Sequence, residues 1–127
     1  MSVSRIHQLV IAAAAAVALA APLGAAAVTE VKGEVVDLEC SLEKGAAGQG
    51  EAHAACAMGC AKDGKPMAIL ADDAVYVIEG DYTANKNAKL LDFVAKKVMA
   101  KGELREHDGK KYLRVVAMTV QPTIVRK

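Results

Sequence analysis

Small or apolar residues alternate with charged ones in the second half of the chain. Within residues 98–106 every second side chain is small or apolar, and this period of two is typical of a strand with one buried face. The residues predicted to face the core are Val98, Ala100, Gly102 and Leu104. An Asp-Gly pair at 108–109 predicts a tight hairpin turn, so we expect residues 111–120 to return as an antiparallel strand.

Three further strands are predicted earlier in the chain, at residues 31–38, 66–71 and 74–79. In the first of them the alternation shifts at Val35 and Val36, which predicts a β-bulge. An Asp-Asp pair separates the other two, which we expect to form a hairpin. The pattern therefore predicts five strands in all.

Two helices are predicted between these strands. Residues 50–64 are rich in alanine, carry Glu51 in the first turn and end at an Asp-Gly pair, where glycine can adopt the left-handed conformation that closes a helix. A second helix is expected to begin at Asn85 or Asn87, either of which can cap it, and to run to about Ala95.

The predicted order is strand, cysteine-containing helix, strand, strand, helix, strand and strand. Without the first helix this is the order of a five-stranded OB-type barrel, so we expect a mainly β fold with two helices. The cysteine-containing helix would then belong to an insertion, residues 40–64, between the first two strands. An open antiparallel sheet with both helices on one face has the same order and remains an alternative.

Residues 1–27 have the pattern of a secretory signal peptide. Arg5 precedes a short apolar run dominated by alanine, and small residues follow it. That run is weak for a permanent membrane span. We expect cleavage after Ala27, with Ala21 as the other candidate. The mature chain, residues 28–127, is then a single periplasmic or secreted domain with no stable membrane insertion.

Charge and aromatic content argue against nucleic-acid binding. The chain has 16 Lys and Arg residues and 15 Asp and Glu residues, and one of the basic residues, Arg5, lies in the predicted signal peptide. The mature chain therefore has no net formal charge to attract a polyanion. Three Tyr residues and one Phe are too few for a surface on which bases stack.

Metal-binding residue types are concentrated in residues 40–60. His53, Cys56 and Cys60 are three, four and seven residues apart, so a helix places them on one face. Cys40, the remaining cysteine, lies upstream across a glycine-rich loop. Together the four residues form a Cys3His set, which is typical of structural zinc, and thiolates also suit Cu(I). We predict a zinc or copper site with these four ligands, structural or carrier-like.

A disulfide is the main alternative to a metal. Cys56 and Cys60, one helical turn apart, have Cβ atoms about 5–6 Å apart, whereas a relaxed bridge needs about 3.5–4.5 Å. Cys40 is therefore the expected partner of one of them, and the other remains a free thiol beside His53. The protein would then be a disulfide-stapled module that binds a protein or a small molecule.

Catalysis is not expected. His53 and Cys56 could form a nucleophilic pair, but no third orienting group is evident. The sequence also lacks a thioredoxin-type Cys-x-x-Cys motif and a phosphate-binding Gly-Lys-Ser/Thr motif. A thiol redox role stays open. Asp37 and Glu39 flank Cys40 and are interpreted as solvent-facing strand residues, with hydrogen bonding to a metal ligand as the alternative.

Three motifs carry a resemblance to known proteins. They are Gly33 followed by Asp37-x-x-Cys40, then His53-x-x-Cys56-x-x-x-Cys60, and Val98-x-x-x-Gly102. With these motifs the mature chain resembles a group of small exported bacterial proteins that have an OB-like fold and no characterised function. The resemblance implies the fold and export, and it implies no activity.

Overall fold

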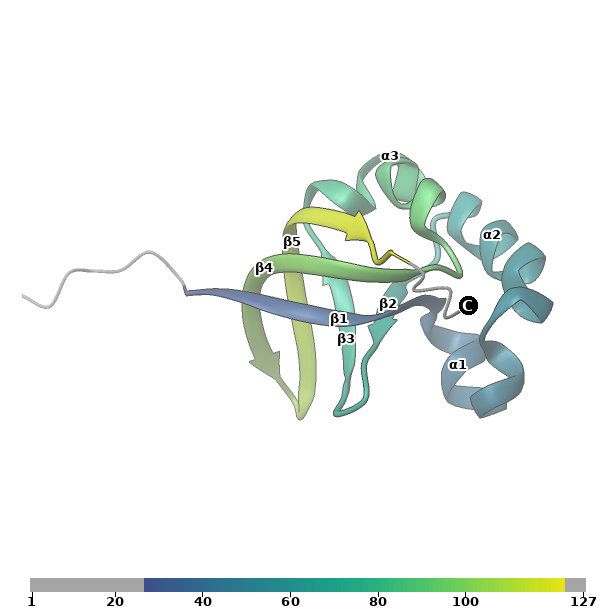
Figure 1. Cartoon of the computed structure of the whole chain (residues 1–127), viewed down its shortest axis with the longest axis horizontal. Helices are drawn as coiled ribbons and strands as arrows, with labels where there is room; N and C mark the ends of the chain where they lie inside the picture. The colour runs from purple at the N-terminus through teal and green to yellow at the C-terminus, as the bar shows by residue number, and fades with distance from the viewer. Residues whose placement is uncertain (1–26, 123–127) are drawn as a thin grey trace, which may run out of the picture.

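In the computed structural model, which describes residues 27–122, five strands form one sheet. They are β1 (Val28–Asp37), β2 (Met67–Leu70), β3 (Val75–Glu79), β4 (Lys97–His107) and β5 (Lys110–Val120). The sheet closes into a ring in the order β1-β2-β3-β5-β4, with β4 paired to β1 (Figure 1). Neighbouring strands are antiparallel except for β3 and β5, which are parallel. The five predicted strands are confirmed, whereas the predicted signal peptide lies outside the described residues apart from Ala27.

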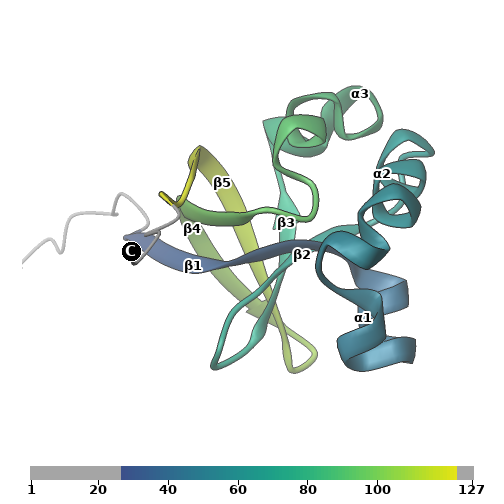
Figure 2. The ribbon, with the colours of Figure 1, turned by 45° about the vertical axis from the view of Figure 1, so that its right-hand side comes forward.

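Helical segments occupy two of the connections. The connection from β1 to β2 contains α1 (Leu38–Lys44), the 3-10 turns η1 (Gly45–Gly48) and η2 (Glu51–His53), and α2 (Ala54–Lys62). The connection from β3 to β4 contains the 3-10 turn η3 (Asp81–Thr83), α3 (Ala84–Asn87) and the 3-10 turn η4 (Ala88–Phe93). Figure 2 shows α1 and α2 beyond the end of β1, with α2 next to the segment that contains α3.

The prediction of two helices is wrong for the described residues, which contain three. The unpredicted helix, α1, forms because the Asp37 side chain accepts hydrogen bonds from the backbone N–H groups at its start, as an N-cap does. The predicted second helix is reduced to α3 and η4. Asn85, Lys86 and Asn87 have φ angles of 51°, 55° and 59°, and a regular right-handed helix cannot run through left-handed residues.

Apolar side chains from all five strands fill the ring. The buried strand residues of this core are Val31, Val35, Met67, Ile69, Tyr76, Ile78, Val98, Ala100, Leu113, Val115 and Met118. The helical connections add Ala57 and Ala61 from α2 and Leu90 from η4. Because α2 buries these two alanines, the cysteine-containing helix packs against the core and is not part of a loosely packed loop.

Leu104 departs from the predicted burial of β4. Val98, Ala100 and Gly102 are buried, as predicted, but Leu104 is 43% exposed. Its cross-strand partner Leu113 is fully buried. The pairing of β4 with β1 ends one residue earlier, at Glu103, so no residue of β1 pairs with Leu104. Leu104 thus shares the inner face with Leu113 but is not buried, and the prediction that it belongs to the core is wrong.

We expect the Leu104→Lys variant to lose at most about 1 kcal/mol of unfolding free energy, because a lysine at this half-exposed position can extend its ammonium group into water. The matched Leu113→Lys variant, at the paired position, should lose several kcal/mol because its charge would be buried without a partner. Urea unfolding of both variants measures the difference. Similar losses for the two variants would contradict the exposed position of Leu104.

Candidate metal centre

The candidate ligands come from four elements at one end of the ring. Asp37 is the last residue of β1, Cys40 lies on α1, His53 ends η2, and α2 carries Cys56 and Cys60. In both ribbon views α1 and α2 are neighbours at this end (Figures 1 and 2). The connection from β1 to β2 therefore folds back so that residues far apart in the sequence meet.

The three cysteines form the first group. The sulfur atoms of Cys40, Cys56 and Cys60 all lie within 4.8 Å of one another. All three are free thiols; Cys56 is exposed, whereas Cys40 and Cys60 are half-buried. Sulfurs bound to one tetrahedral zinc at about 2.3 Å are about 3.7 Å apart, so small side-chain rotations suffice for a shared metal. The group is open to solvent on the side of Cys56.

The second group lies deeper and shares Cys40 with the first. One ligand atom each from Asp37, Cys40 and His53 lies within 4.8 Å of the other two. Asp37 is fully buried and His53 is 7% exposed. Asp37 Oδ2 and His53 Nε2 are the buried side-chain atoms of the described residues that have no hydrogen-bond partner. Such unpartnered atoms cost free energy, about 1–3 kcal/mol each.

The predicted Cys3His residues are thus all brought to one place, but in two overlapping groups. His53 is grouped with Cys40 and Asp37, not with Cys56 and Cys60. The reason is the helix start: α2 begins at Ala54, and His53 belongs to the preceding 3-10 turn. Its side chain therefore does not continue the helical face that carries Cys56 and Cys60.

Asp37 was not among the predicted ligands, and its interpretation as a solvent-facing strand residue is wrong. Its Oδ1 accepts from the N–H groups of Glu39, at 3.0 Å, and of Cys40, at 3.4 Å. The residue is buried because the end of β1 is covered on both sides, with Val35, Val36 and Asp37 buried in succession. The Asp-x-x-Cys spacing, in which an aspartate precedes a possible first helical turn, is the sequence signal for this cap.

Asp37 and the nearby thiols influence each other's protonation. Burial by itself raises the pKa of Asp37, but contacts with the thiols of Cys60 and Cys40 and with the N–H groups of Cys40 and Glu39 outweigh it, so the pKa is lowered. In turn, interaction with the Asp37 carboxylate, followed by burial, raises the pKa of Cys60 to about 12 and also raises that of Cys40. A bound cation would replace these thiol protons, so metal binding should release protons.

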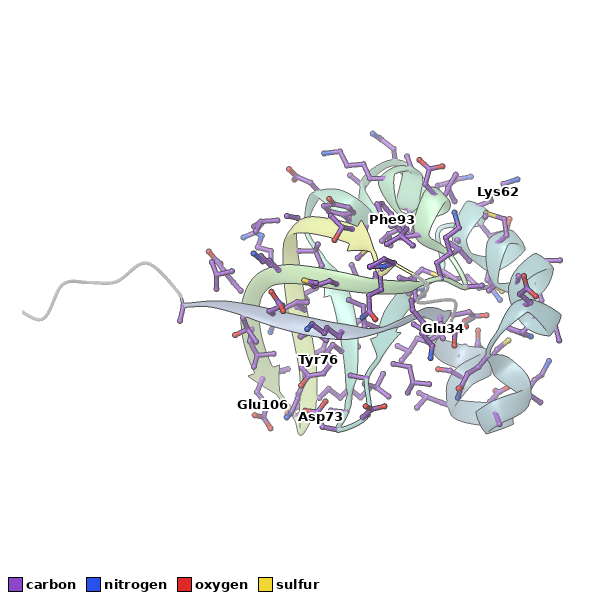
Figure 3. All side chains as sticks on the ribbon, in the orientation of Figure 1. Glu34, Lys62, Asp73, Tyr76, Phe93 and Glu106 are labelled. Carbon is purple, nitrogen blue, oxygen red and sulfur yellow. The ribbon has the colours of Figure 1, made fainter. Side chains whose placement is uncertain are left out.

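The loop between α1 and α2 is held by contacts of its own. The N–H group of Gly50 donates to Glu34 Oε1 at 2.8 Å, which ties the loop to β1. Figure 3 shows Glu34 on β1 beside this loop. Gly48 packs so closely on α1 that a Cβ there would lie 2.5 Å from the carbonyl oxygen of Cys40. The loop is thus anchored to β1 and to the cysteine-bearing helix α1.

Comparison with protein-family models, with curated proteins and with solved structures gives no match for this chain. Within the described part of the chain, no helix has both the length and the apolar character that crossing a bilayer requires. The case for a function therefore depends on the geometry of the cysteine, histidine and aspartate groups.

Proposed function

We propose that this protein is an exported metal-binding protein with an OB-like barrel, and that its metal lies among Cys40, Cys56, Cys60, His53 and Asp37. The OB-like fold is supported by the strand order β1-β2-β3-β5-β4 and by the helical connection between β3 and β4. Export is supported by the sequence pattern of residues 1–27 and by the start of β1 at Val28, the first residue after the expected cleavage site.

The observation that carries the proposal is the pair of unpartnered buried atoms, Asp37 Oδ2 and His53 Nε2. Both belong to residues whose ligand atoms are grouped with that of Cys40. Buried polar atoms normally have a partner, and a cation is a partner that a carboxylate, an imidazole and a thiolate can share. The adjacent sulfurs of Cys56 and Cys60 extend the donor set.

The donor types favour zinc or copper. Thiolate, imidazole and carboxylate are all ordinary zinc ligands, and thiolates bind Cu(I) well. The exposure of Cys56 favours an exchangeable, carrier-like metal over a closed structural one. We assign no catalytic activity to the site.

The test is metal analysis of protein purified from the periplasm. The intact mass of the sample should match a chain that begins at Val28. The reduced protein should bind Zn²⁺ or Cu(I) at one ion per chain. Cys40→Ser should weaken binding more than about 100-fold, because Cys40 belongs to both groups. Metal binding should be weakened less by Cys56→Ser, Cys60→Ser or His53→Ala. The control variant Ser41→Ala, next to Cys40 on α1, should bind metal as tightly as the parent.

The proposal fails if the reduced chain binds neither metal, or if Cys40→Ser binds as tightly as the parent. Removal of the metal by a chelator should lower the melting temperature of the parent protein and leave that of Cys40→Ser unchanged. A mass that retains residues 1–27 in protein recovered from the periplasm would contradict the processing.

A disulfide-stapled binding module remains the second candidate, favoured by the closeness of the three sulfurs and by an apolar groove. The groove has a volume of about 260 Å³ and is lined by residues that include Leu38, Leu42 and Val75. Leu42 is 67% exposed there. This candidate predicts that His53→Ala and the substitution of one cysteine leave stability unchanged, while removal of either bridged cysteine costs about 2–4 kcal/mol.

A further inference from the structure

We propose that the three thiols also form a thiol–disulfide switch, in which Cys56 attacks a small-molecule disulfide and Cys40 then displaces it to form a Cys40–Cys56 bridge. The thiol chemistry stands on the geometry of the cysteines alone. Its consequence for metal release rests on the proposed function.

Exposure identifies Cys56 as the first thiol to react. It is the exposed member of the group, whereas Cys40 and Cys60 are half-buried. The sulfur of Cys40 also lies within 4.8 Å of a carboxylate oxygen of the buried Asp37. A disulfide from solution needs open access to the attacking sulfur, and among the three sulfurs Cys56 offers it.

Helix geometry identifies Cys40 as the thiol that completes the bridge. Cys56 and Cys60 lie on the same helix, α2, four residues apart, and a bridge between them would distort that helix. Cys40 lies on α1, which has no buried residue, whereas α2 buries Ala57 and Ala61. We therefore expect α1 to move towards α2 and to close the gap of at most 4.8 Å between the sulfurs to the bond length of about 2.05 Å.

The reaction is balanced with glutathione disulfide as the oxidant. The Cys56 thiol loses its proton, and its sulfur attacks one sulfur of the oxidant, whose S–S bond breaks to release one glutathione thiolate. The Cys40 thiol then loses its proton and attacks Cys56 Sγ, and the second glutathione leaves as a thiolate. The two protons from the cysteines convert the two thiolates to glutathione. Two electrons pass from the cysteines to the oxidant.

The bridge and the metal exclude each other because Cys40 belongs to both candidate ligand groups. A Cys40–Cys56 bridge removes two ligands from the group of three cysteines and one from the Asp37, Cys40 and His53 group. What remains is Cys60 with Asp37 and His53. Oxidation should therefore release the metal, and bound metal should protect the thiols.

The test treats the reduced, metal-free mature chain with glutathione disulfide and maps the product by mass spectrometry. The parent should release two glutathione molecules per oxidant consumed and contain a Cys40–Cys56 bridge, as should Cys60→Ser. Cys40→Ser should stop at a stable mixed disulfide on Cys56. Cys56→Ser should react at least about tenfold more slowly. Circular dichroism of each variant checks that it is folded.

A mapped bridge that involves Cys60 would overturn the proposal, as would a Cys40→Ser chain that accumulates no mixed disulfide on Cys56. The same reaction is then run on chain loaded with Zn²⁺. Zinc should slow the reaction at least about tenfold and leave the protein as the bridge forms. If the chain binds no zinc but the metal-free chain forms the Cys40–Cys56 bridge, the metal proposal fails and the thiol chemistry stands. If zinc binds but Cys56 does not react, the switch fails.

Discussion

The Asp37→Ala variant is expected to lose about 1–2 kcal/mol of unfolding free energy and to bind metal at least about tenfold more weakly than the parent. The loss of stability follows from the cap, because the N–H groups of Glu39 and Cys40 at the start of α1 lose their acceptor. The loss of affinity follows from the buried carboxylate beside Cys40 and His53. Urea unfolding of the metal-free chain and a zinc titration measure the two effects.

The Asp37→Asn variant separates these two roles. Its amide oxygen can still accept from the backbone of α1, so stability should fall much less than in Asp37→Ala. The negative charge is gone, so metal affinity should still fall. Glu39→Gln is the charge control, because Glu39 lies in the first turn of α1 but is exposed. Asp37→Asn with parental metal affinity would exclude Asp37 as a ligand.

A second large effect is expected at Gly102, where the Gly102→Ala variant should lose about 3 kcal/mol. A Cβ there would lie 2.2 Å from the carbonyl oxygen of Arg114 and 3.0 Å from the Cα atom of Val115. Both contacts are with backbone atoms of β5, so a side-chain rotation cannot relieve them. Gly102 also lies at the register shift between β4 and β5 and pairs with Thr29 of β1, so any shift disturbs both sides of the ring.

The matched control for this substitution is Gly59→Ala on α2. A Cβ at Gly59 would have no atom within 4 Å, and alanine is the better helix former, so this variant should gain up to about 1 kcal/mol. Chemical unfolding of the two metal-free variants gives the comparison. A Gly102→Ala chain as stable as the parent would show that β5 adapts to the extra methyl group.

The strands could be predicted because most of them are buried on one face, and such strands have a two-residue period in the sequence. The prediction was wrong at two places where a distant segment determines burial. Leu104 is half-exposed because β1 does not extend alongside it. Asp37 is buried because the end of β1 is covered on both faces. The closure of the ring through β1 and β4 likewise depends on contacts between segments far apart in the sequence.

At the site, the sequence predicted that the three cysteines and His53 meet, but it missed Asp37 and did not predict the division into two groups. The spacing of Cys56 and Cys60 is that of one helical face, and the structure confirms that they share α2. The position of His53 depended on where that helix begins, which spacing alone does not determine. Helix α1 is only seven residues long, too short to show a periodic pattern. Its N-cap residue, Asp37, was therefore the sequence feature from which this helix could have been predicted.

The anchoring of Gly50 to Glu34 and of Gly48 against Cys40 has a thermodynamic consequence. Because these contacts order the loop without an ion, little chain entropy remains to be lost when the ion arrives. Metal should then add to stability by mass action alone, about 2.7 kcal/mol at a free concentration 100 times Kd. The amide groups of β1 to β5 should be protected from hydrogen exchange in the same order in the metal-free protein as in the metal-bound protein. Unlike a zinc finger, which unfolds without its ion, this domain could acquire and release its ion while it remains folded.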